Sequence, residues 1–130
     1  MTAEPLRRFA RKGWVHVLFA FVAMGSWAVF VNHGHDMPRP IYAGLVQGTM
    51  SAGLTLLLKS VIDGLSHRIA YPMQLWAPPA IACLGSATLL LAIHAASGTP
   101  EIWKTIAVPL LVSTSYATLY NYSISARRGP

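Results

Sequence analysis

The chain carries the stretch WVHVLFAFVAMGSWAVFV at residues 14–31, in which His16 is the one side chain that can take a charge. A helix needs about 20 apolar residues to cross the hydrocarbon core of a bilayer. Three further apolar stretches follow, at Tyr42 to Leu58, Leu75 to Ala96 and Ile106 to Tyr122. None alternates apolar and polar residues as the strands of a membrane barrel do. The sequence therefore predicts an all-α membrane protein with one domain, residues 1–130, of four transmembrane helices.

The composition also indicates an integral membrane protein. Hydrophobic residues make up 54% of the 130 residues and charged residues only 11%, which are too few to solvate the surface of a globular domain. The single cysteine, Cys83, excludes an intramolecular disulfide. The net charge of +6 would favour anionic lipid headgroups. Nucleic acid is not an expected partner, because the chain has no soluble basic domain.

The ten cationic residues are unevenly distributed between the predicted connections. Two of them, Arg39 and Lys104, lie in the first and third connections, and the other eight lie before the first stretch, around the middle connection or near the C-terminus: Arg7, Arg8, Arg11, Lys12, Lys59, Arg68, Arg127 and Arg128. Connections rich in Lys and Arg stay on the cytoplasmic side. We therefore expect both termini in the cytosol, in a multi-pass protein of a bacterial inner membrane. The first stretch lacks a signal-peptide cleavage pattern, so we expect it to be retained.

Parts of the chain recur at a spacing of about sixty residues. Gly25-Ser26 lies fifteen residues before Pro40, and Gly85-Ser86 lies fifteen before Pro100. At a spacing of sixty-three, Ser51, Thr55-Leu56 and Ser60 correspond to Thr114, Thr118-Leu119 and Ser123. Repeats of this kind are common in membrane transporters. The pattern predicts two similar hairpins, at about residues 13–65 and 73–125.

Prolines mark expected helix starts and kinks. Pro40 and Pro100 each precede an apolar run, where a first-turn proline costs no intrahelical hydrogen bond, and Thr99 is a candidate N-cap. Pro78-Pro79 and Pro109 fall inside the third and fourth stretches, where we expect them to kink the helix. Such kinks either line a cavity or only shape the packing, and both interpretations stay open.

The second stretch carries a stripe of polar side chains, because Gln47, Ser51, Thr55 and Lys59 recur every four residues and share one helix face. Their counterparts at the spacing of sixty-three are Thr114, Thr118 and Tyr122, and Asn121 lies beside them. Together with Arg127 these residues form the polar seam, our candidate substrate-binding site: Gln47, Ser51, Thr55, Lys59, Thr114, Thr118, Asn121, Tyr122 and Arg127. The alternative is that the hydroxyls bond their own helix backbone and that Lys59 snorkels to the interface. Next to the seam, Gly44, Gly48 and Ala52 form a small-residue strip that permits close helix packing.

The acidic residues narrow the choice of substrate. Glu4, Asp36, Asp63 and Glu101 all lie at or outside the margins of the apolar stretches, whereas proton-coupled export of a cation uses an acid within the membrane. An anionic substrate fits better, because Lys59, Arg127 and Arg128 are expected near the inner face.

The histidines carry only a weak metal signal. His33, His35 and Asp36 fall in one predicted outer loop, with His94 expected on the same side. We interpret this group as an ordinary polar loop, so that no metal and no cofactor is implied. No Ser-His-Asp arrangement, phosphate loop or carboxylate pair emerges, and the chain is therefore not expected to be an enzyme.

Two features of the chain are similar to a known family. Arg8-Phe9 precedes Gly13 at the start of the first apolar stretch, and Tyr120-Asn121-Tyr122 followed by Arg127 closes the last one. In these the chain resembles the GtrA-like family, small four-helix membrane proteins proposed to move polyprenyl-phosphate-linked sugars across the bacterial inner membrane for surface-polysaccharide modification. The family often places Asn-Arg at the ends of its second and fourth helices, where this chain has Leu58-Lys59-Ser60 and Asn121-Tyr122. The resemblance implies a headgroup-facing role for Lys59, Asn121 and Arg127.

These observations lead to two hypotheses of function. The first is a carrier or flippase for an anionic isoprenoid-linked lipid, such as a polyprenyl-phosphate sugar, with the polar seam exposed to alternate faces of the membrane. The second is a non-catalytic accessory subunit that packs against a larger membrane enzyme through Gly44, Gly48 and Ala52. We expect a homo-oligomer, because four helices enclose little volume.

Overall fold

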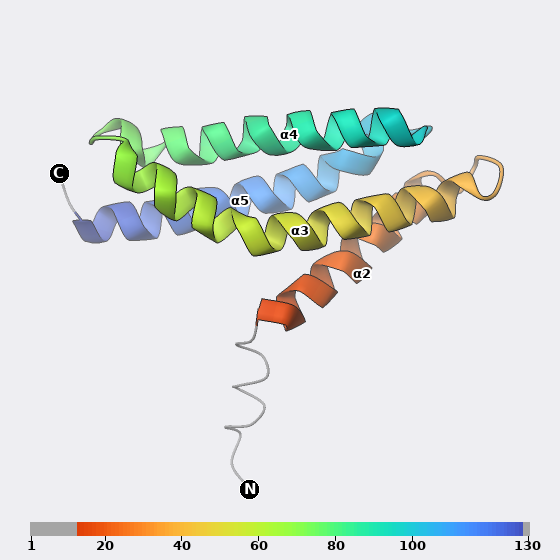
Figure 1. Ribbon diagram of the computed structural model, residues 1–130, viewed down its shortest axis with the longest axis horizontal. Helices are drawn as coiled ribbons and strands as arrows, with labels where there is room; N and C mark the ends of the chain where they lie inside the picture. The colour runs from red at the N-terminus through yellow and green to blue at the C-terminus, as the bar shows by residue number, and fades with distance from the viewer. Residues whose placement is uncertain (1–12, 129–130) are drawn as a thin grey trace, which may run out of the picture.

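The computed structural model describes residues 13–128, which form four α-helices and one short 3-10 helix (Figure 1). In chain order these are α2 (Gly13–Val31), α3 (Arg39–Arg68), η1 (Met73–Leu75), α4 (Ala77–Ser97) and α5 (Ile102–Arg128). No strand occurs among the described residues. The prediction of an all-helical fold is confirmed.

Three of the helices, α2, α3 and α4, are long and apolar enough to cross a bilayer by length and composition, which fits a membrane protein. The 27-residue helix α5 is not among them, because from Ser113 onward it carries many hydroxyl and amide side chains, among them Tyr116 and Asn121. A fourth span therefore stays a prediction.

Helix α3 lies at the centre of the arrangement and contacts α2, α4 and α5. Helices α3, α4 and α5 run side by side along the long axis of the molecule, while α2 crosses α3 and diverges from the other helices toward its N-terminal end (Figure 1). The polypeptide thus forms two antiparallel hairpins, α2–α3 and α4–α5. Gly25 of the first hairpin is buried, whereas its counterpart in the second hairpin, Gly85, is exposed. In the second hairpin the next residue, Ser86, is the buried one. Because corresponding residues of the two hairpins have different surroundings, an internal duplication stays a prediction.

Glycines bring α2 and α3 close together where they cross. A Cβ atom added to Gly25 would lie 2.9 Å from the carbonyl oxygen of Gly44, and one added to Gly48 would lie 2.9 Å from that of Phe21. Real Cβ atoms essentially never approach other atoms this closely. The small-residue strip predicted on α3 therefore permits close packing, and its neighbour at Gly44 and Gly48 is α2 of the same chain.

The helix ends follow from local sequence. Pro40 lies in the first turn of α3 as expected. The expectation that Pro78-Pro79 would kink the third helix is wrong, because α4 begins at Ala77 and both prolines sit in its first turn, where no intrahelical bond is lost. Helix α4 ends at Ser97 and is capped by Gly98, whose φ of 74° is the left-handed conformation that glycine adopts without strain.

Helix α5 is capped by a side chain from another part of the chain. The backbone N–H of Glu101 donates to Oδ1 of Asn32 over 2.9 Å, and Nδ2 of Asn32 donates to the hydroxyl of Thr105 over 2.8 Å. The N–H of Thr105 donates to the carbonyl of Glu101, which makes Glu101 the cap residue of α5 in place of Thr99. Asn32 thus joins the end of α2 to the start of α5.

The two ends of the molecule differ in their side chains. We call the end where α3 and α5 terminate the arginine end, after Arg68, Arg127 and Arg128, and the opposite end the histidine end, after His33 and His35 in the α2–α3 connection (Figure 1). Toward the arginine end α3, α4 and α5 share an apolar core, composed of Leu58, Ile62, Ala82 and Ala117 with Tyr120 and Ile124 packed against it.

Candidate functional site

Gln47 and Ser51 of the polar seam are buried toward the histidine end and bonded to each other. The side-chain nitrogen of Gln47 donates to Oγ of Ser51 over 2.8 Å, and Oε1 of Gln47 lies 2.8 Å from Nε2 of His94 on α4. An amide oxygen only accepts, so His94 donates through Nε2. In the neutral imidazole Nδ1 then accepts from the hydroxyl of Thr99, 2.7 Å away. We call these four buried side chains, Gln47, Ser51, His94 and Thr99, the histidine network.

At this end of the polar seam, Gln47 and Ser51 are already hydrogen-bonded within the histidine network. A ligand that bonded to Gln47 or Ser51 would have to break a hydrogen bond between buried side chains, which is costly. The arrangement therefore favours a role in holding α3 against α4. The sequence predicts His94 on the same side as the outer-loop histidines. It does not indicate that His94 pairs with Gln47, which lies forty-seven residues away along the chain.

The remaining seam residues on α3 have different neighbours. Oγ1 of Thr55 donates to the carbonyl of Ser51 in its own helix over 2.8 Å. Lys59 is exposed; its Nζ lies 3.7 Å from Oδ2 of Asp63 and 5.6 Å from the ring centre of Tyr120 on α5. The Tyr120 hydroxyl donates to Oδ1 of Asp63 over 2.6 Å. Asp63 therefore offsets the charge of Lys59, an interaction that the polar stripe in the sequence does not indicate.

The seam residues on α5 make hydrogen bonds separate from those of the seam residues on α3. Thr118 donates to the carbonyl of Thr114 in its own helix over 2.7 Å, and Tyr122 and Arg127 are exposed. Asn121 is fully buried, and its Nδ2 donates to two carbonyl oxygens of the α3–α4 connection, those of Gln74 at 2.8 Å and of Leu75 at 3.0 Å. Among the described residues, no hydrogen bond joins Gln47, Ser51, Thr55 or Lys59 to this second set.

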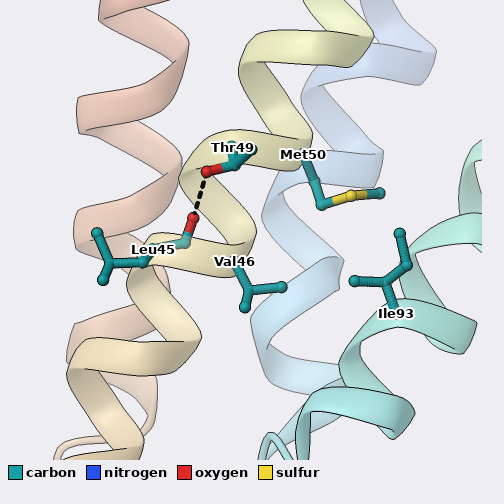
Figure 2. A pocket seen from close by; sticks show the side chains of 5 residues that line it. All are labelled: Leu45, Val46, Thr49, Met50 and Ile93. Carbon is teal, nitrogen blue, oxygen red and sulfur yellow. Dashed lines mark hydrogen bonds between the residues drawn. The ribbon is translucent and has the colours of Figure 1, made fainter.

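An open groove of about 290 Å³ lies between α3 and α4, and Figure 2 shows Val46, Met50 and Ile93 facing one another across it. Its lining is completed by Leu45 and Thr49. The Thr49 hydroxyl donates to the carbonyl of Leu45 over 2.8 Å, so the groove offers an apolar surface. Met50 is an unbranched, adaptable side chain that fits apolar chains of irregular shape.

The histidine end carries a few charged contacts at its surface. Nε2 of His35 and Nζ of Lys104 each lie 3.8 Å from Oε1 of Glu101. Within residues 13–128, no group of three His, Cys, Asp or Glu side chains could hold a metal ion. His94 is occupied in the histidine network and lies apart from this surface.

No family model matches the chain, and neither a curated protein nor a solved structure matches it.

Proposed function

We propose that this protein is a four-span carrier or flippase for an anionic isoprenoid-linked lipid, such as a polyprenyl-phosphate sugar, in the bacterial inner membrane. Such an activity would serve the modification of cell-surface polysaccharide, as the resemblance to the GtrA-like family implies. The cargo chain would stay in contact with lipid while the headgroup changes sides.

The groove between α3 and α4 is the observation that carries this proposal. Val46, Met50 and Ile93 present hydrocarbon to it, and its one hydroxyl, that of Thr49, is already bonded to backbone. In a bilayer such a groove is filled by a lipid chain, because water would leave its hydrogen bonds unsatisfied there. The tails of bulk lipids are as apolar as the groove, so the groove does not distinguish one lipid tail from another. The protein would therefore have to select its lipid by the headgroup.

A translocation assay tests the proposal. Full-length protein is reconstituted into phosphatidylcholine vesicles that contain a fluorescent polyprenyl phosphate, and the fraction accessible to an impermeant quencher is followed with time. Wild-type protein is expected to move the probe, and Ile93→Trp, which fills the groove, is expected to slow it severalfold.

Ile81→Trp is the matched control, since Ile81 is exposed on the same helix outside the groove and this variant is expected to keep the wild-type rate. Equal rates for Ile93→Trp and Ile81→Trp would remove the groove from the mechanism. No movement by wild type would reject the carrier function.

The closed histidine network specifically favours the second candidate, a non-catalytic accessory subunit. Gln47 and Ser51 satisfy each other and His94, as expected of side chains that only hold helices together. A partner enzyme could not use the faces of Gly44 and Gly48 that α2 already covers, so it would bind another apolar surface. Co-purification of one larger membrane enzyme, with no lipid movement by the isolated chain, would decide for this candidate.

A further inference from the structure

The ends of α3 and α5 are joined through Arg128. Its Nη1 donates to Oγ of Ser66 over 3.0 Å, and its Nη2 lies 3.0 Å from Nε2 of His67. A guanidinium group only donates, so this imidazole nitrogen accepts and the ring is neutral in this contact. Both partners are uncharged, and Arg128 therefore keeps its full positive charge in a fixed place.

Within residues 13–128, no carboxylate pairs with any of the three arginines of the arginine end. Arg127 precedes Arg128 directly, and Arg68 follows His67, which Arg128 contacts; both side chains are exposed. The one acid near this end in that range, Asp63, is bonded to Tyr120 and faces Lys59. The C-termini of two helices contribute about −0.5 charge each, so about +2 remains from the three guanidinium groups when only the described part of this end is counted.

The donors of Arg128 suit a phosphate group. A guanidinium has five N–H donors, of which Ser66 and His67 occupy two, and the planar fork matches phosphate oxygens. Holding the side chain beforehand reduces the entropy lost when a ligand binds. Tyr71 and Trp76 are exposed in and beside the adjacent α3–α4 connection, as is typical of side chains at the depth of lipid headgroups.

We propose that Arg128, positioned by Ser66 and His67, binds the phosphate group of a membrane lipid, with Arg68 and Arg127 adding positive charge. This inference rests on the proposed lipid-carrying function, because it identifies the headgroup site of the carried lipid. It also replaces Lys59 as the main headgroup contact, since Asp63 already faces that ammonium group.

Native mass spectrometry of the full-length protein in phosphatidylcholine nanodiscs tests this site, with dioleoylphosphatidic acid as the probe. Charge-assisted hydrogen bonds contribute enough that Arg128→Gln should weaken lipid retention about tenfold or more. Arg128→Lys should retain part of the affinity, because it keeps the charge and loses the fork. Arg39→Gln, which removes an exposed cation at the histidine end, should change nothing. Equal retention by Arg128→Gln and wild type would overturn the site.

A competition arm distinguishes a lipid headgroup from free phosphate. Millimolar inorganic phosphate should leave the probe bound, whereas its displacement at that concentration would assign the site to the free anion and overturn the lipid assignment. The vesicle assay separates this inference from the proposed function. Retention that depends on Arg128, without movement of polyprenyl phosphate by wild type, would keep the site and reject the carrier. If Arg128→Gln changes neither the movement of polyprenyl phosphate nor the retention of the probe, the carrier function is kept and the Arg128 site is rejected.

Discussion

At the scale of single residues, His94 shows how a polar side chain is accommodated inside this apolar bundle. Its ring donates to Gln47 and accepts from Thr99, so neither nitrogen is left without a partner. Burial of an unpaired polar group in hydrocarbon costs several kcal/mol. The network therefore couples the position of α4 to that of α3.

Replacing Gln47 by leucine is expected to lower stability, because it leaves Nε2 of His94 and the hydroxyl of Ser51 without their shared partner. We expect the free energy of unfolding in detergent to fall by about 1–2 kcal/mol, as measured by denaturant titration. Thr49→Val is the control on the same helix, since that hydroxyl bonds only its own backbone, and its effect should stay below about 0.5 kcal/mol. Full stability of Gln47→Leu would mean that the network holds nothing together.

Asn32 makes a second set of buried contacts that a single substitution tests. Asn32→Ala removes the bonds to the N–H of Glu101 and to the hydroxyl of Thr105, and we expect a loss of about 1–2 kcal/mol, as for an N-cap residue. Asn32→Asp keeps the acceptor for Glu101 and should retain part of the stability. Thermal unfolding followed by circular dichroism measures both, and equal midpoints for Asn32→Ala and wild type would contradict the capping role.

At the scale of elements, the crossing of α2 and α3 depends on glycine at defined positions. Gly48→Ala would place a methyl group 2.9 Å from the carbonyl oxygen of Phe21, and separating the helices is expected to cost about 1–3 kcal/mol. Gly53→Ala provides the matched control on α3, because nothing lies within 4 Å of the added atom. Unfolding in detergent should distinguish the two variants, and a Gly48→Ala protein as stable as Gly53→Ala would show that the contact is not tight.

The apolar stretches of the sequence predicted the helices well in number and position but not in length. The second stretch, Tyr42 to Leu58, lies within α3, which extends to Arg68, because a helix continues through polar residues once it leaves hydrocarbon. The partners within the site were not predictable. Whether Lys59 faces Asp63 and Tyr120, or Gln47 faces His94, depends on how each helix is rotated about its axis. The small-residue strip indicated close packing at Gly48, but it did not indicate that the neighbour there is α2, and so it did not fix the rotation of α3.

At the scale of the whole molecule, charge divides the bundle into unlike ends. Three arginines lie at one end and have no acidic partner in the part of the chain that the structure describes: Arg68, Arg127 and Arg128. At the other end Lys104 is paired with Glu101. The basic group Arg7 to Lys12 lies outside the described residues. Segments rich in Arg and Lys remain cytoplasmic, so the proposed headgroup site would open toward the inner leaflet.

Cysteine labelling tests this orientation. In a Cys83→Ala background, Gly34→Cys places a thiol in the exposed α2–α3 connection and Ala126→Cys places one in the exposed last turn of α5. An impermeant maleimide should label Gly34→Cys in intact cells and Ala126→Cys only after permeabilisation, because the arginine end is expected in the cytosol. Labelling of Ala126→Cys in intact cells would place the arginine end outside. A carrier that collects a phosphate-linked lipid from the inner leaflet could not then use Arg128 for that step.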